Sequence, residues 1–460
     1  MVAYYLGATA LTDAFFIAWK IPNIFRRVLG EGALEKVFLP LLKGGFDRGF
    51  VRRVFFHLLI SSLGVSVLLT LLSEEIVELI APGGGAVKLA SHLLGYLAFY
   101  LPFAVLSAFF SALLQYKRRF FLAYFSSALF NLTAIAFLLL FARRWGVYAL
   151  VAGVLAGGLV QALFSVLAAY RFNLLFPPQA GIDSKVKELF KNLLPSLGSL
   201  GVGQLSTLAE AFFATRSGVG VLSALYYAFR LFQLPVSVIG VSSSRVSLSY
   251  LTTAGDIFSK DPRYLEFTLK KYLLKGGEVA LFFAVPALIG LLLFAEPIVR
   301  LVYQRGAFSP EDTQRVALYL QLYALGLPAA ALHPLAANIF YIKERFYIVF
   351  LLSSVWLAVE LLLPAVGLFY LNLGGWIIAL AYSSGAWSSF LTLALFTGSL
   401  PLFWRSFWRL KRCFIYWLLT AVFLLLPPIR ENTLFTLPAV VAVALFYLWR
   451  FKKVYLKGMK

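Results

Sequence analysis

The stretch LTDAFFIAWKIPNIFRRVLGEGA, residues 11–33, has the apolar character of a membrane helix and yet carries five charged side chains. Each such charge costs about 2.5–3.5 kcal/mol at the centre of a spanning helix on insertion scales. On a helical wheel most of the polar residues share one stripe: Asp13, Lys20, Arg27 and Glu31, with Asn23 at its margin. The stripe therefore predicts a helix whose polar face points into a bundle and away from lipid.

The composition of the whole chain agrees with a membrane protein. The 460 residues are 61% hydrophobic and only 13% charged, and the mean hydropathy is +0.86. Apolar runs of about 18 or more residues recur from end to end, which predicts an all-α polytopic membrane protein. The net charge of +21 fits basic loops that meet anionic lipid, so nucleic acid is not an expected partner. With one cysteine and three histidines, no metal or cofactor is expected.

Thirteen hydrophobic helices are predicted, and the breaks between them alternate in charge. The ranges are 9–41, 53–80, 89–116, 120–142, 146–170, 186–214, 218–252, 272–303, 313–341, 346–370, 375–400, 413–428 and 434–450. One set of breaks, with the C-terminal tail, carries 27 lysines and arginines, whereas the other set carries 8. The basic set is expected in the cytoplasm, which makes the C-terminus cytoplasmic.

The chain also contains an internal repeat. The loop KRRF at 117–120 matches KERF at 343–346, and EEIVELI at 74–80 matches AEPIVRLV at 295–302. Both basic loops fall on the same predicted side, so the halves are parallel repeats of about six helices with a cavity expected between them. The predicted architecture is two six-helix lobes plus two C-terminal helices, in the segments 1–178, 179–400 and 401–460.

The repeat predicts one further helix. The second half begins with a complete helix at about 185–215, before the helix that holds Arg230, whereas only twelve residues precede Asp13 in the first half. We therefore expect one amino-terminal helix of the repeat to be missing from the chain as given.

Two equivalent helices, one per half, carry basic and hydroxyl-bearing faces. Ser223 and Arg230 share a stripe of the second helix, with Gln233 at its margin, and each helix contains a proline, Pro22 or Pro235. One interpretation is that the charges neutralise each other, for instance Lys20 with Asp13. The other is that surplus arginine binds an anion, because a planar guanidinium donates two hydrogen bonds to a phosphate or pyrophosphate. Two further acids amid apolar residues, Glu210 and Glu360, are either structural or a candidate cation or proton site.

Three stretches resemble the MurJ (MviN) family of bacterial lipid II flippases, within the multidrug/oligosaccharidyl-lipid/polysaccharide exporter superfamily. They are TDAFFIAWKIPNIFRRVLGEGALEKVFLP, SALYYAFRLFQLPVSVIGV and VYQRGAFSPEDTQRVALYLQLYALGLP. The resemblance implies fourteen helices and a transporter, not an enzyme. It implies that lipid II crosses the bacterial cytoplasmic membrane to the outer leaflet by alternating access, its pyrophosphate bound in a cationic cavity. By motif match, the residues implied in substrate binding are Arg26, Arg230, Asp13, Asn23, Glu31 and Ser223.

The resemblance leaves several points open. The driving force would be Na⁺, H⁺ or the membrane potential, and the partners would be membrane lipids and the cell-wall synthesis machinery. Gln233 stands where some relatives have glutamate, and the family's first-helix arginine is absent. The main alternative is a flippase for another polyprenyl-pyrophosphate-linked glycan of O-antigen or capsule type. A membrane enzyme is disfavoured, because the one tight acidic cluster, at 74–78, is predicted to be extracytoplasmic.

Overall fold

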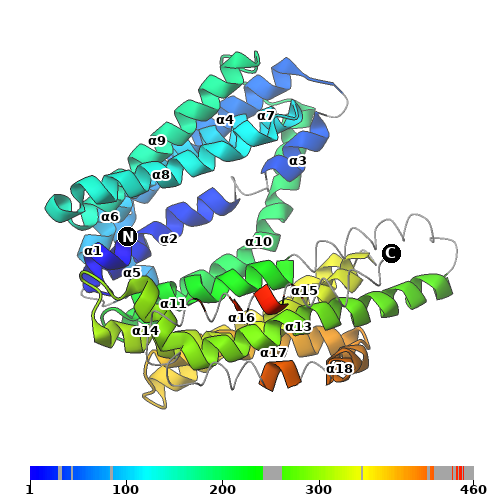
Figure 1. The fold of residues 1–460 in the computed structure, drawn as a ribbon. Helices are drawn as coiled ribbons and strands as arrows, with labels where there is room; N and C mark the ends of the chain where they lie inside the picture. Colours follow the sequence, from blue (N-terminus) through cyan, green and yellow to red (C-terminus); the bar gives the residue numbers. More distant parts are fainter. Residues whose placement is uncertain are drawn as a thin grey trace. The chain divides into compact units, whose positions relative to one another are not determined.

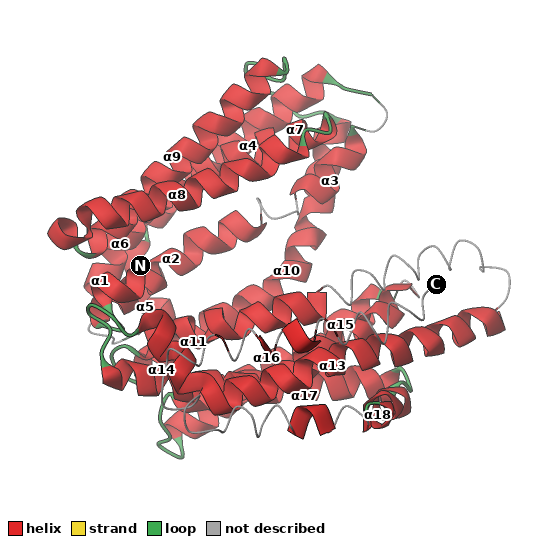
Figure 2. Cartoon of the chain, in the orientation of Figure 1, coloured by secondary structure: helices red, strands yellow, loops and turns green. Residues whose placement is uncertain are grey.

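The fold was analysed in a computed structural model, which describes residues 1–28, 34–42, 45–82, 86–241, 262–342, 345–411 and 415–418, with a few positions between 438 and 449. Within these residues every regular element is a helix (Figures 1 and 2). The predicted all-α class is therefore confirmed. The predicted helices at 413–428 and 434–450 lie mostly outside the described residues.

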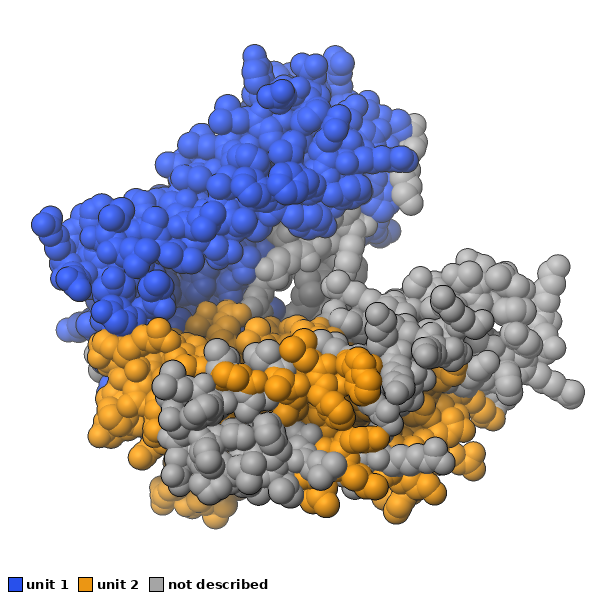
Figure 3. Space-filling model, in the orientation of Figure 1, with its two compact units in different colours: residues 1–223 blue, residues 224–460 orange. Residues whose placement is uncertain are grey.

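The contacts divide the chain into two compact units, Met1–Ser223 and Ala224–Lys460 (Figure 3). Unit 1 contains α1 (Val2–Leu6), α2 (Ala10–Val28), α3 (Leu34–Leu41), α4 (Arg48–Leu71), α5 (Ser73–Ile80), α6 (Val87–Ala98), α7 (Tyr100–Tyr116), α8 (Phe120–Trp145), α9 (Val147–Arg171) and α10 (Ser184–Arg216). Helix α11 (Val221–Val236) begins at the end of unit 1 and continues into unit 2. The predicted segment boundaries at 178 and 400 rest on the repeat and stay predictions.

Unit 2 continues from α11 through a short π-helix, η2 (Ser237–Val241). Its remaining helices are α13 (Pro262–Tyr303), α14 (Pro310–Ala324), α15 (Leu327–Ile342), α16 (Phe346–Phe369), α17 (Trp376–Phe396) and α18 (Leu400–Arg409). In the described part of the chain, nine helical stretches are long and apolar enough to cross a membrane. The chain is therefore a multi-span helical membrane protein.

Several predicted helices are divided in the structure. The predicted helix at 9–41 is α2 and α3 on either side of residues 29–33, which lie outside the described residues. The predicted helix at 53–80 is α4 followed by α5, with Leu72 between them in a non-helical conformation. Ser73, Glu74 and Glu75 follow Leu72 directly, but the apolar runs on both sides of so short a polar segment read as one helix.

The internal repeat is visible in the backbone of the two basic loops. Arg119, which precedes α8, has φ −94° and ψ 56°, and Arg345, which precedes α16, has φ −93° and ψ 56°. Each of these residues donates its backbone N–H to a carbonyl five residues earlier, Leu114 or Phe340. Arg119 and Arg345, the third residues of KRRF and KERF, thus adopt the same conformation before their helices.

Helix α2 is held in unit 1 by its apolar side. Ala14 and Ala18 have no exposed surface and Ile17 is 2% exposed, and the helix contacts α6, α7, α9 and α10. Trp19 also packs on Tyr100 of α7, with ring centroids 5.3 Å apart. Close packing by small residues fixes the rotation of α2 and so fixes the direction of its polar stripe.

Candidate functional site

The second half of α2 presents an arginine that is oriented by an asparagine. The Oδ1 of Asn23 accepts hydrogen bonds from Nε and Nη2 of Arg26, at 3.1 and 3.0 Å. Both side chains are half-buried. Pro22 lies inside the helix just before them. The spacing of three residues places Asn23 beside Arg26 on one helix face, so the asparagine limits the rotamers open to the guanidinium. Glu31, the other predicted site residue of this stretch, lies outside the described residues.

Asp13, at the start of α2, is bound to the beginning of α11. Its carboxylate accepts from the backbone N–H of Gly220 at 2.6 Å and of Ser223 at 2.8 Å, and also from the Ser223 hydroxyl. Asp13 is 5% exposed and Ser223 is fully buried. A carboxylate at the first turn of a helix satisfies donors that have no partner within the helix. In this structure the two residues are therefore partners of each other, and contact with a ligand would require them to separate.

Lys20 is paired with Glu210, whereas one interpretation of the sequence paired it with Asp13. Its Nζ donates to the backbone carbonyl of Thr207 at 2.6 Å and lies 3.8 Å from Oε1 of Glu210. The lysine side chain is 10% exposed and the glutamate 26%. The sequence places Glu210 on an apolar helix but gives no sign of this partner, which is 190 positions away along the chain.

In unit 2, Arg230 of α11 is supported by neutral side chains. Its Nη2 donates to the Tyr226 hydroxyl at 2.8 Å and its Nη1 to Oε1 of Gln233 at 3.2 Å. The guanidinium also lies over the Tyr226 ring, 4.7 Å from the centroid. Arg230 is exposed and makes no ion pair with any residue that the structure describes. Its positive charge is therefore available to an anion. Tyr226 was not among the predicted site residues, although its spacing of four residues from Arg230 is a usable signal.

Glu360, the second candidate for a cation site, lies on α16 of unit 2. Its Oε1 accepts from the indole N–H of Trp356, four residues earlier, at 2.9 Å. No group of three or more His, Cys, Asp or Glu side chains with metal-binding geometry occurs within the described ranges. Glu210 and Glu360 belong to different units, and a coupling role for either stays a prediction.

A cluster that sequence reasoning missed ties residues 177–183 to the start of α4. Asp183 caps α10 by accepting from Val186 N–H at 2.8 Å, and it forms an ion pair with Arg53 of α4. Asp47 caps α4 and pairs with Lys185 at 3.1 Å. The signal was available, because Asp before a helical run is a typical N-cap.

Both carboxyl groups of this cluster have lowered pKa values. The Phe50 backbone N–H is the main cause for Asp47, with Lys185 adding to it. Burial raises the pKa of Asp183, but the Val186 N–H and Arg53 outweigh it and lower the pKa overall. Both groups are thus ionised more readily in the folded protein than in the unfolded chain.

Comparison with known proteins places these features in a family. The model of the family described as lipid II flippase MurJ matches residues 2–441. A probable lipid II flippase MurJ of Aquifex aeolicus is 33% identical over 387 residues, which cover 83% of this chain and 75% of the relative. The corresponding protein of Bdellovibrio bacteriovorus is 32% identical over 375 residues, covering 78% of this chain and 70% of the relative.

Solved structures agree with the fold. A lipid II flippase MurJ in an inward closed conformation has a TM-score of 0.81 at 24% identity and covers all of this chain and 95% of its own. An inward-facing multidrug transporter of the MATE family has a TM-score of 0.63 at 16% identity, over 88% of this chain and 92% of its own. The chain thus shares the fold of these two solved proteins. With a family model that spans nearly its whole length, the chain belongs to the MurJ lipid II flippase family.

Proposed function

We propose that this chain moves lipid II from the cytoplasmic to the outer leaflet of the bacterial cytoplasmic membrane by alternating access. Family membership supports this proposal, since the matching relatives are named lipid II flippases. The nine apolar helical stretches found among the described residues support a site within the membrane.

The observation that carries the proposal is the setting of Arg230. The tyrosine hydroxyl and the amide oxygen orient the plane of the guanidinium, and because both acceptors are neutral they do not offset its positive charge. A diphosphate offers several acceptor oxygens, and planar two-point hydrogen bonding matches that geometry. We assign the same role to Arg26, whose orientation is set by Asn23. Each charge-assisted bond contributes roughly 1.5–3 kcal/mol, which offsets desolvation of the head group.

We propose that the buried contact of Asp13 also helps to close the transporter, and the role of Asp13 and Ser223 in substrate binding stays a prediction. Its carboxylate holds the first turn of α11, the helix that also carries Arg230. Breaking this contact in another state would release α11 and change the setting of Arg230. The energy source for that change is a further proposal, with the membrane potential favoured over a cation at Glu210, because that glutamate already has an ammonium partner.

The test is rescue of bacteria depleted of their own lipid II flippase. We expect Arg230→Ala and Arg26→Ala to lower transport roughly tenfold or more, as the loss of one charge-assisted bond implies. Arg300→Ala is the matched control, since Arg300 is an exposed arginine of unit 2 paired only with Glu296. Full rescue by either test variant would overturn the role given to these arginines. A chain that inserts and is well expressed but never rescues would point to another polyprenyl-pyrophosphate-linked glycan.

A further inference from the structure

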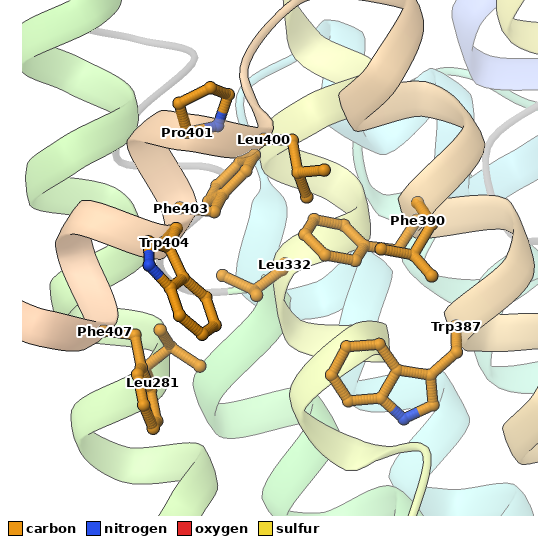
Figure 4. A pocket seen from close by; sticks show the side chains of 10 residues that line it. Leu281, Leu332, Trp387, Phe390, Leu400, Pro401, Phe403, Trp404 and Phe407 are labelled. Atoms are coloured by element: carbon orange, nitrogen blue, oxygen red, sulfur yellow. The ribbon is translucent and has the colours of Figure 1, made fainter.

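Unit 2 contains an apolar pocket that the proposed transport does not use. It encloses about 680 Å³, within the roughly 300–1,000 Å³ range of small-molecule sites. Four helices line it: Leu281 from α13, Leu332 from α15, Phe390 from α17 and Phe403 from α18 (Figure 4). These four side chains are buried, whereas Trp387 and Trp404 at the rim are 37% and 61% exposed.

The lining excludes a polar ligand. All ten lining side chains are aliphatic or aromatic. The indole N–H of Trp387 is already donated to the backbone carbonyl of Leu325 at 2.9 Å. A sugar, nucleotide or peptide backbone bound here would leave its polar groups without partners, at a cost in free energy. The pocket therefore fits a hydrocarbon chain.

The position of the pocket sets the kind of chain. On α17, Trp387 lies nine residues before the end of the helix at Phe396, a distance of about 14 Å at 1.5 Å per residue. That is close to half of a hydrocarbon core of about 30 Å. The lining residues of α17 thus lie within about 14 Å of the end of a spanning helix, which is the depth of about one leaflet.

Helix α18 closes the pocket at the end of that span and has the character of an interfacial helix. Its inner side is fixed to α13, because Ser406 donates to the Leu274 carbonyl at 3.0 Å and Arg409 pairs with Glu278 at 3.1 Å. Its outer side exposes Trp404 and Trp408. Aromatic side chains of this kind favour the level of the lipid head groups.

A cation lies next to the rim residue Trp404 in the sequence of α18. The Arg405 side chain is exposed and makes no hydrogen bond or ion pair with any described residue. Lys411, just beyond α18, is also exposed. We propose that the pocket binds one acyl chain of a resident anionic phospholipid, whose phosphate is held by Arg405. The apolar lining of the pocket favours the acyl chain, and the positive charge of Arg405 favours an acidic lipid head group over a zwitterionic one.

This inference is independent of transport, and its test uses bound lipid as the readout. The full chain is purified in detergent, and native mass spectrometry compares retention of phosphatidylglycerol with retention of phosphatidylcholine bearing the same acyl chains. We expect the parent protein to retain phosphatidylglycerol in preference to phosphatidylcholine. The Arg405→Gln variant should bind phosphatidylglycerol about tenfold less tightly. Leu391→Trp, which adds bulk at the rim, should abolish the preference.

Two controls match these variants. Leu395→Trp adds the same bulk one turn further along α17, at a residue that is 63% exposed and does not line the pocket. Arg300→Gln removes one exposed positive charge at the other end of α13. Both should retain phosphatidylglycerol like the parent protein.

The remaining outcomes overturn the proposal. If Leu391→Trp weakens binding of a polyprenyl pyrophosphate but leaves phosphatidylglycerol unchanged, the occupant is the tail of a transported lipid. If neither lipid responds to Leu391→Trp, the pocket is filled by the chain itself. If every variant retained both phospholipids equally, Arg405 would not select the acidic head group.

Discussion

Replacing Asp13 by alanine is expected to destabilise the protein by about 2–4 kcal/mol. The carboxylate is the acceptor for two backbone N–H groups, of Gly220 and Ser223, and it is 5% exposed. A buried donor left without an acceptor costs about 1–3 kcal/mol, so two donors at the lower part of that range give the stated figure. The Ser223 hydroxyl can rotate toward another acceptor and is not included.

Two milder variants calibrate this value. Ser223→Ala removes one donor but leaves the carboxylate on both backbone N–H groups, so a loss of about 1 kcal/mol is expected. Asp13→Asn keeps one acceptor oxygen but removes the negative charge at the start of α11. In partly buried settings the interaction of such a charge with the helix dipole stabilises a protein by up to about 2 kcal/mol. The expected order of destabilisation is therefore Asp13→Ala, then Asp13→Asn, then Ser223→Ala.

The assay is unfolding of the purified full chain in mixed micelles by increasing sodium dodecyl sulfate, followed by circular dichroism. Free energies of unfolding are compared at one detergent composition. If Asp13→Ala is no more destabilising than Ser223→Ala, the two backbone donors have other acceptors and the carboxylate does not hold the first turn of α11.

Two further predictions concern stability. The folded pKa values of Asp47 and Asp183 are lowered, so their contribution to the free energy of unfolding is present above the ordinary aspartate pKa of 3.8 and is lost as the pH falls below it through the folded pKa values. Thermal unfolding at decreasing pH should show this loss of stability. If a variant with asparagine at both positions lost stability with pH in the same way as the parent protein, the prediction would be contradicted. Gly158→Ala should destabilise by about 1–3 kcal/mol, because its Cβ would lie 2.6 Å from a ring carbon of Tyr100. Gly64→Ala, with nothing within 4 Å, should be neutral or stabilising by the same unfolding measurement, and equal effects of the two alanines would refute the packing argument.

Much of the fold was predictable because local patterns determine it. Apolar runs identified the spanning helices, and the match of KRRF with KERF agrees with the shared backbone angles of Arg119 and Arg345. The helix breaks were missed. Leu72 is followed by Ser73, Glu74 and Glu75, which are typical of a helix start, but this polar segment is short and lies between two apolar runs.

The candidate site was predictable in its residue types but not in its pairings. Arg26 and Arg230 stand out as charges in apolar helices, and their supports at Asn23 and Tyr226 lie three and four residues away. The partners of Asp13 are 207 and 210 positions distant, beyond the reach of periodicity. The pocket of unit 2 was invisible for the same reason, since four helices each contribute to it.

The pairing of Lys20 has a consequence for the order in which the protein is made. Its acceptor at Thr207 is separated from it by 187 positions, and synthesis at about 5–20 residues per second needs about 10–40 s to cover that distance. During this interval α2 holds an ammonium group without its native partner, so water or lipid phosphate must solvate it. We therefore expect α2 to reach its final depth only after α10 has been made, so that integration of the first helices depends on a later one.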